Sequence, residues 1–229
     1  MLPFPFLHLV PARFKLDDKR CFEFYGRSKF RELYEAAHSM NCDQNPRYFF
    51  HGTLGAGKSH LLAALACLLM REGKIVVYVP DCSELLGNPL EYFRTALEFA
   101  YDSRERVRII LKALRQEVVE EHIALERLSD FCNQRLKLDT AFFIVDQANA
   151  FDDDTVPGSH RFSNKKKQIR NLLDASSAKH LKLESSSANY KHASTDLLRE
   201  TSEKRIGLYH GLDEVSRQRV DRILHIANW

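Results

Sequence analysis

Residues 52–59 read Gly-Thr-Leu-Gly-Ala-Gly-Lys-Ser and match the pattern G-x-x-x-x-G-K-[ST] at every fixed position. A β-prone run, RYFFH at 47–51, precedes the match, and an apolar run, LLAALACLLM at 61–70, follows it. Strand, glycine-rich loop and helix in this order predict a phosphate-binding loop, because loop amides and a helix N-terminus attract anions. An ordinary glycine turn is the alternative interpretation.

We expect this loop to surround the phosphates of a nucleotide. The residues expected to contact the nucleotide are Gly52, Thr53, Gly55, Ala56, Gly57, Lys58, Ser59 and His60. Among them, Lys58 is expected to reach the β- and γ-phosphates as a mobile positive charge, and the Ser59 hydroxyl is expected to coordinate Mg²⁺.

A second magnesium ligand is expected at the end of a neighbouring buried strand. Residues 141–145 read AFFIV, a wholly apolar run, and Asp146 follows them directly. We predict that Asp146 holds Mg²⁺ together with Ser59, as the carboxylate of a phosphate-binding site does. The alternative is that Asp146 only begins a turn.

The residue after Asp146 departs from the usual pattern of hydrolytic P-loop proteins, which place a glutamate there. Gln147 can orient an attacking water through its amide, but it cannot accept a proton. We therefore predict either slow turnover or a general base from elsewhere, such as Asp81. The predicted catalytic residues are Lys58, Asp146, Gln147 and Asn189.

The apolar runs predict a three-layer α/β P-loop fold with a mainly parallel five-stranded sheet. A helical period from about 90 to 138 predicts an inserted helical block. The expected strands are 47–51, 74–79, 141–145, 181–183 and 206–209. We predict the strand order 5-1-4-3-2 by position in the chain, which ends the fourth strand at the nucleotide crevice.

That strand order gives the polar stretch SSSAN at 185–189 a place beside the nucleotide. Asn189 is accordingly a candidate sensor of the γ-phosphate. The alternative is that the serines and the asparagine of residues 185–189 only form a turn.

The charge of the chain does not by itself indicate a polyanionic partner. Among 229 residues, 44% are hydrophobic, and 34 Lys and Arg face 31 Asp and Glu, for a net charge of +3. A local basic patch at 161–170 contains Arg161, the run Asn164-Lys-Lys-Lys and Arg170. It predicts contact with DNA or a host protein, although a solvated helix start is the alternative. Because this Asn-Lys run lacks the Asp of guanine-specific elements, we expect ATP rather than GTP.

The remaining features predict an intracellular protein with an N-terminal extension at 1–21 and a P-loop domain at 22–229. The five cysteines show no C-x-x-C or C…H ligand spacing, which favours a reducing compartment. The longest apolar stretch, 61–70, is about half as long as a membrane-spanning helix, so no membrane association is expected. The sequence shows no clear lid domain after the fifth strand, so either the lid is absent or the chain is a fragment of a longer protein. A homo-oligomer is possible, but the sequence does not decide the oligomeric state.

The order of the motifs resembles the P-loop ATPase domain of Crinkler-type effectors. The matching segments are HGTLGAGKSHLLAALACLL, VVYVPDC, FFIVDQANAF, KKKQIRNLLDASS and SSSANY, within residues 22 to 212. Similar domains occur in retrotransposon hot spot proteins, and both groups are AAA-like. The resemblance implies phosphate and magnesium roles for Gly52, Gly57, Lys58 and Ser59, a magnesium role for Asp146 and a sensor role for Asn189. It also implies an effector that is secreted or acts in a host nucleus.

Two other functions are compatible with the same motifs. In a nucleotide-gated binding module, Gln147 leaves hydrolysis almost absent, and ATP orders a surface that contacts DNA or a protein. In a small-molecule kinase, ATP is consumed only when an acceptor substrate is present. Phosphate release without an acceptor separates a slow ATPase from both.

Overall fold

The computed structural model describes residues 1–7, 10–44, 46–116, 120–135, 140–151, 160–178, 180–186 and 204–208. Their centre is a five-stranded sheet in which every neighbouring pair of strands is parallel. Its strands are β3 (Arg47–Gly52), β4 (Ile75–Val79), β5 (Ala141–Val145), β6 (Leu181–Ser185) and β7 (Lys204–Leu208). The spatial order β4-β5-β6-β3-β7 is the predicted order 5-1-4-3-2, which is confirmed.

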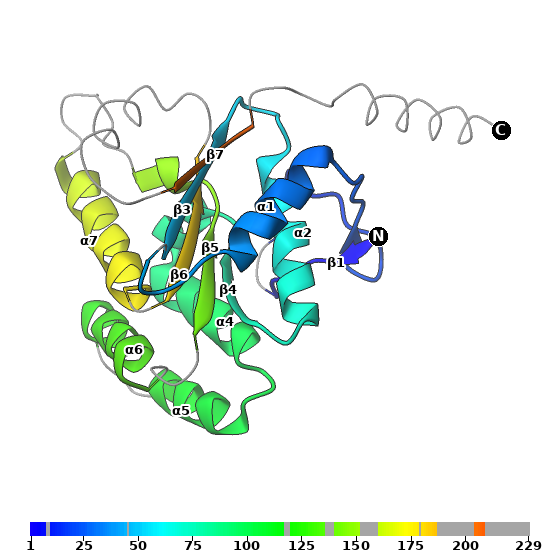
Figure 1. The fold of residues 1–229 in the computed structure, drawn as a ribbon. Helices are drawn as coiled ribbons and strands as arrows, with labels where there is room; N and C mark the ends of the chain where they lie inside the picture. The colour runs from blue at the N-terminus through cyan, green and yellow to red at the C-terminus, as the bar shows by residue number, and fades with distance from the viewer. Residues whose placement is uncertain are drawn as a thin grey trace.

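Helices cover both faces of this sheet, as Figure 1 shows. α1 (Ser28–His38) and α2 (Lys58–Arg71) pack against each other on one face, and α7 (His160–Ser176) lies on the other. β4 and β5 are buried along their whole length, as strands covered on both faces are. The three-layer α/β P-loop fold predicted from the sequence is confirmed.

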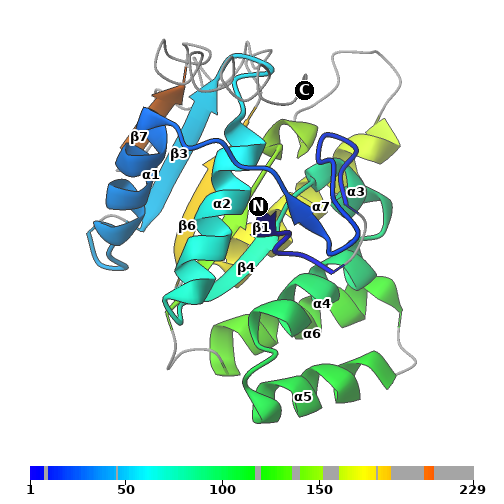
Figure 2. The same cartoon turned by 90° about the vertical axis from the view of Figure 1, so that its right-hand side faces the viewer.

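Four helices connect β4 to β5, where the sequence predicted a helical block. They are α3 (Cys82–Gly87), α4 (Pro89–Ala100), α5 (Glu105–Gln116) and α6 (Glu121–Arg135), and Figure 2 shows α4, α5 and α6 grouped below the sheet. The sequence prediction began near 90 and missed α3. This short helix begins directly after β4 because the Asp81 side chain accepts a hydrogen bond from the Ser83 N–H at 2.9 Å.

Three further features were not predicted from the sequence: α1, two short strands and the beginning of α7. Phe30, Leu33, Tyr34 and Ala37 carry the apolar spacing of a helix in α1, so the signal was present. α7 begins at residue 160, one residue before the basic patch at 161–170. β1 (Leu2–Pro3) and β2 (Cys21–Phe22) form a small antiparallel pair, and a 3₁₀ turn, η1 (Ala148–Phe151), follows β5.

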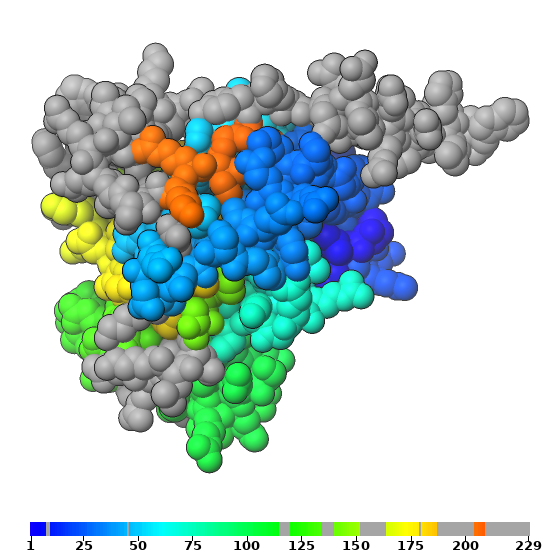
Figure 3. All heavy atoms as spheres, in the orientation of Figure 1, coloured from blue at the N-terminus to red at the C-terminus, as the bar shows by residue number. Residues whose placement is uncertain are grey.

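The N-terminal segment packs into the same hydrophobic core as the sheet. Phe4, Phe6, Phe14 and Phe22 are at most 5% exposed and belong to that core. Figure 3 shows the N-terminal residues in dark blue against the side of the molecule formed by α1 and α2. The division between 1–21 and 22–229 stays a prediction, but the segment is packed against the residues of the P-loop domain.

None of the helices in the described ranges has both the length and the apolar character needed to cross a membrane.

Candidate nucleotide site

The candidate site lies at the carboxyl edge of the sheet, where parallel α/β sheets form ligand crevices. β3 ends at Gly52, and the glycine-rich loop runs from there to α2. β5 ends one residue before Asp146, and the adjacent β6 ends at Ser185. Since these strands are parallel neighbours, residues far apart in the sequence meet at this edge.

Gly52 is in close contact with β7. Its φ angle is +155°, and a Cβ atom added to it would lie 1.9 Å from the Leu208 carbonyl oxygen. The Thr53 N–H donates a hydrogen bond to the same oxygen at 3.2 Å. The start of the loop is therefore held against β7, at a position that only glycine fits.

Substituting Gly52 by alanine is expected to destabilise the protein by about 3 kcal/mol, because the new methyl group overlaps backbone rather than a side chain that could turn away. Chemical denaturation followed by circular dichroism measures the change. Gly87→Ala is the matched control, since Gly87 is exposed and a Cβ there has nothing within 4 Å. Equal stabilities of the two variants would contradict the close contact.

The loop turns into α2 as a phosphate-binding loop requires. Gly57 has a φ of +81° and precedes the helix, whose first hydrogen bond runs from the Leu61 N–H to the Gly57 carbonyl at 3.1 Å. The N–H groups of Lys58, Ser59 and His60 come before that bond, so the helix itself does not use them. They are the donors that a helix N-terminus offers to an anion.

The Lys58 side chain folds back over the loop. Its Nζ donates hydrogen bonds to the carbonyls of Gly52 and Thr53, both at 2.8 Å. Burial lowers the pKa of this ammonium, and the Asp146 carboxylate opposes the shift. Lys58 thus lies inside the loop, held by local carbonyl groups.

A cavity of about 450 Å³ opens beside the loop. The residues that line it come from the glycine-rich loop, the start of α2, the segments after β5 and β6, and the N-terminal segment. The lining residues are Arg13, Leu54, Gly55, Gly57, Lys58, Ser59, His60, Asp146, Gln147 and Ser186. Thr53, Ala56 and Gly52 shape the loop from outside this lining, and the Ala56 N–H donates to the Thr53 carbonyl at 3.1 Å.

Asp146 is 2% exposed and its two oxygens face different partners. Oδ1 accepts hydrogen bonds from the Ser185 hydroxyl at 2.5 Å and from the Gln147 N–H at 2.9 Å. Oδ2 lies 3.4 Å from the guanidinium of Arg13. The carboxylate is thereby fixed in the wall of the cavity, with Oδ2 beside a cation.

Gln147 lines the cavity next to Asp146, in an unusual backbone conformation. Its φ is +60°, in the left-handed region that residues other than glycine rarely adopt. The Ala150 N–H donates to its carbonyl at 3.0 Å, which ties Gln147 to η1. The structure thus places at the cavity an amide side chain where a hydrolytic site usually has a carboxylate.

Two arginines upstream of the loop belong to this site, although neither was predicted from the sequence. Arg13 ion-pairs with Asp81 at 2.9 Å and with Asp146. Arg27, which precedes α1, donates a hydrogen bond to the Ala56 carbonyl in the loop. Neither arginine lies in a motif, so only the folded structure identifies them.

His60 meets the N-terminal segment at the rim of the cavity. The centroid of its ring lies 4.6 Å from the centroid of the Phe14 ring. Burial lowers its pKa, and the nearby guanidinium groups of Arg13 and Arg27 lower it further. A neutral imidazole therefore packs against the phenyl ring beside the loop.

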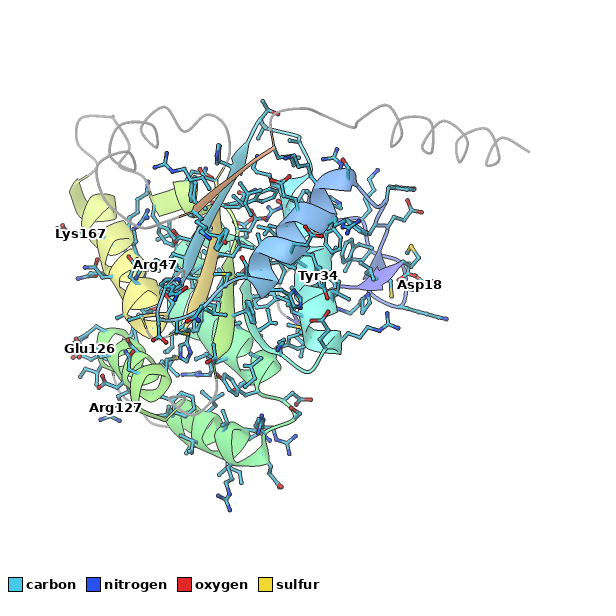
Figure 4. The ribbon with its side chains drawn as sticks, in the orientation of Figure 1. Asp18, Tyr34, Arg47, Glu126, Arg127 and Lys167 are labelled. Carbon is cyan, nitrogen blue, oxygen red and sulfur yellow. The ribbon has the colours of Figure 1, made fainter. Side chains whose placement is uncertain are left out.

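The structure describes some of the other residues proposed from the sequence and leaves others out. Asn189 falls outside the described residues, and Ser185 of the same stretch contacts Asp146. Asp81 contacts Arg13 and caps α3. In the basic patch, Arg170 lies 4.0 Å from both Asp174 and Glu184, whereas Lys167 is exposed on the outer side of α7 (Figure 4). The Arg161 side chain is outside the described part.

The donor set beside Lys58 suits a hard divalent cation. Ser59 and Asp146 offer hydroxyl and carboxylate oxygens to one cavity, and oxygen ligands are those that Mg²⁺ prefers. Within the described ranges, no group of three or more His, Cys, Asp or Glu residues could hold a metal by themselves. Such a site fits Mg²⁺ that arrives with phosphate oxygens and water as its further ligands.

The chain matches no protein-family model, and no curated protein sequence matches it. Among solved structures it is similar to PCH-2 from C. elegans, with a TM-score of 0.42, 13% identity and coverage of 87% of this chain and 47% of that one. It is also similar to AMPPCP-bound DnaA from Aquifex aeolicus, with a TM-score of 0.42, 17% identity and coverage of 89% and 52%. The chain thus spans about half the length of these two proteins, and its function has to be argued from its own residues.

Proposed function

We propose that this chain is a Mg²⁺-dependent ATP-binding protein that slowly hydrolyses ATP to ADP and phosphate. One observation supports it above the others: Lys58 and Ser59 at the start of α2 and Asp146 at the end of β5 line the same cavity. An ordinary glycine turn has no need for a buried carboxylate across from it. A cradle of amides with a lysine and a carboxylate is suited to a triphosphate with its metal.

The residues of the loop would bind the phosphates in three ways. The N–H groups at the start of α2 donate hydrogen bonds, and the helix dipole adds a partial positive charge. The ammonium of Lys58 exchanges the carbonyls of Gly52 and Thr53 for phosphate oxygens. Ser59 and Asp146 would hold Mg²⁺, and the bound ion would neutralise phosphate charge.

We further propose that turnover is slow because Gln147 stands where a general base is expected. Its amide orients a water without accepting the proton. Asp146 is the carboxylate among the described lining residues, and its Oδ1 is occupied by Ser185 and Gln147. The same observation favours the second candidate function, a nucleotide-gated binding module for DNA or a protein with almost no hydrolysis.

The finer assignment is also a proposal. The order of motifs supports a Crinkler-type ATPase domain, and the absence of an Asn-Lys-x-Asp element supports ATP over GTP. Four further proposals rest on that resemblance or on the sequence pattern. They are a sensor role for Asn189, contact with DNA or a host protein through 161–170, assembly as a homo-oligomer, and action in a host nucleus.

Calorimetric titration tests the proposed function directly. Wild-type protein is expected to bind ATP in the presence of Mg²⁺, to bind it at least about tenfold more weakly in EDTA, and to discriminate against GTP by a similar factor. Phosphate release without an added acceptor then separates the ATPase from the binding module and from a kinase. A protein that binds neither nucleotide would refute the assignment.

A further inference from the structure

Arg13 reaches the candidate nucleotide site from a segment outside the motifs. It lies between β1 and β2, and its side chain lines the cavity together with Lys58. Its Nη1 donates to Asp81 Oδ2 at 2.9 Å, and its Nη2 donates to the Pro80 carbonyl and lies 3.4 Å from Asp146 Oδ2. The guanidinium thus joins the ends of β4 and β5 at the cavity wall.

The N-terminal segment holds Arg13 in this position through aromatic packing. Phe14, next to it, is buried and contacts the ring of His60 at the start of α2. On the other side, Phe6 packs against Tyr92 of α4, with ring centroids 4.8 Å apart. Because the segment is fixed at both sides of Arg13, placing the guanidinium on a ligand costs little further conformational entropy.

Arg13 faces the oxygen of Asp146 that a metal would use. Oδ1 of Asp146 is occupied by Ser185 and Gln147, so Oδ2 is the oxygen left for a magnesium ion or its water. In the structure the guanidinium supplies the positive charge at that oxygen. A divalent cation beside Oδ2 would repel the Arg13 guanidinium from Asp146, and phosphate oxygens could then take the place of Asp146 while the ion pair with Asp81 remains.

The Arg13 side chain can form a contact with phosphate oxygens in addition to its present ion pairs. It is 24% exposed, so a ligand can reach it, and its buried Nε has no hydrogen-bond partner in the described part of the chain. Burial lowers the pKa of this guanidinium, but the carboxylates of Asp146 and Asp81 outweigh that effect and raise the pKa overall. Arg13 is therefore a fixed positive charge at the metal end of the cavity.

We propose that Arg13 is a phosphate-binding residue that contacts the terminal phosphate of ATP and, without nucleotide, neutralises Asp146. This inference rests on the proposed function, because it needs a triphosphate in the cavity. It makes the N-terminal segment part of the nucleotide site. The competing explanation is that Arg13 only fastens the segment to the ends of β4 and β5.

The two explanations differ in whether Arg13 distinguishes ATP from ADP. Calorimetry with the non-hydrolysable analogue AMPPCP and with ADP, both with Mg²⁺, measures this without relying on activity. In Arg13→Ala the dissociation constant for AMPPCP is expected to rise about 10- to 100-fold, the range of a charge-assisted hydrogen bond, and that for ADP less than threefold. Arg13→Lys, which keeps the charge without the planar fork, is expected to recover part of the loss.

Lys15→Ala is the matched control. Lys15 lies two residues away on the same segment, is exposed, and carries the same charge. The dissociation constants of Lys15→Ala for AMPPCP and for ADP are expected to equal those of the wild type. An Arg13→Ala protein whose thermal midpoint falls while its ADP-to-AMPPCP ratio stays that of the wild type would overturn the proposal and leave a structural tie.

Asp81 gives a second, independent test as a positioning residue for Arg13. Asp81→Asn keeps an oxygen that can cap α3 but removes the charge that orients the guanidinium. Asp81→Asn alone is expected to weaken the binding of AMPPCP several-fold. When it is combined with Arg13→Ala, the dissociation constant for AMPPCP is expected to equal that of Arg13→Ala alone. Additive effects of the two substitutions would contradict a shared role.

The outcomes also separate this inference from the proposed function. If the wild type binds neither nucleotide, both fail. If the wild type binds AMPPCP and Lys58→Ala does not, while Arg13→Ala binds it like the wild type, the proposed function stands and only the role of Arg13 is refuted.

Discussion

Lys58→Ala is expected to abolish measurable binding of ATP. The ammonium is the buried cation inside the loop, and the two carbonyls that hold it belong to the loop itself, so phosphate oxygens can replace them without a rearrangement elsewhere. Losing a charge-assisted contact in a largely desolvated site costs about 2 to 3 kcal/mol or more, which is roughly a 100-fold loss of affinity. Calorimetric titration with ATP and Mg²⁺ measures this loss.

The control for that prediction is Lys74→Ala. Lys74 is exposed just before β4 and carries the same charge, so its removal tests any effect of net charge alone. Circular dichroism of Lys58→Ala is expected to show an intact fold, since the alanine leaves α2 and its packing in place. If the folded Lys58→Ala protein bound ATP as tightly as the wild type, the assignment of the loop would be wrong.

Asp146→Asn is expected to reduce multiple-turnover phosphate release about 100-fold or more while metal-free ATP binding stays within a few-fold of the wild type. An amide keeps an oxygen for Ser185 and Gln147, so the strand end stays in place. It lacks the negative charge that binds the magnesium ion and its water. A titration with Mg²⁺ at fixed ATP shows the effect as a loss of the metal-dependent increase in rate.

Asp18→Asn is the control for this substitution, because Asp18 is exposed and lies on the side of β1 and β2, as Figure 4 shows. Should the wild type prove to be a binding module with negligible turnover, the same comparison is made on AMPPCP affinity. There, Mg²⁺ is expected to strengthen binding in the wild type and in Asp18→Asn but not in Asp146→Asn. An unchanged metal effect in Asp146→Asn would remove Asp146 from the magnesium site.

The sequence was sufficient for the sheet and for the loop because both depend on local patterns. The glycine-rich loop lies between an apolar strand and an apolar helix, and continuous apolar runs such as 141–145 mark strands buried on both faces. The order of the strands is not a local pattern, and it was expected from the resemblance to AAA-like P-loop domains. The structure agrees, with β6 between β3 and β5.

The side chains around Asp146 could not be found in the same way, because they meet it only through tertiary packing. Arg13 is 133 residues from Asp146 and 68 from Asp81, in a stretch whose prolines and phenylalanines carry no periodic signal. Ser185 lies within the polar stretch 185–189, in which Asn189 was the predicted site residue. The hydroxyl that orients the carboxylate depends on the register of β6 against β5, which pairs Val145 with Glu184.

The contact between Gly52 and Leu208 links the order of synthesis to the assembly of the site. β3 is made early, yet its two neighbours in the sheet, β6 and β7, are the last strands of the described chain. Pairings of such long sequence separation form late and expose strand edges until they do. On the ribosome, the glycine-rich loop therefore gains its backbone support only after residue 208 has emerged, more than 150 residues behind it.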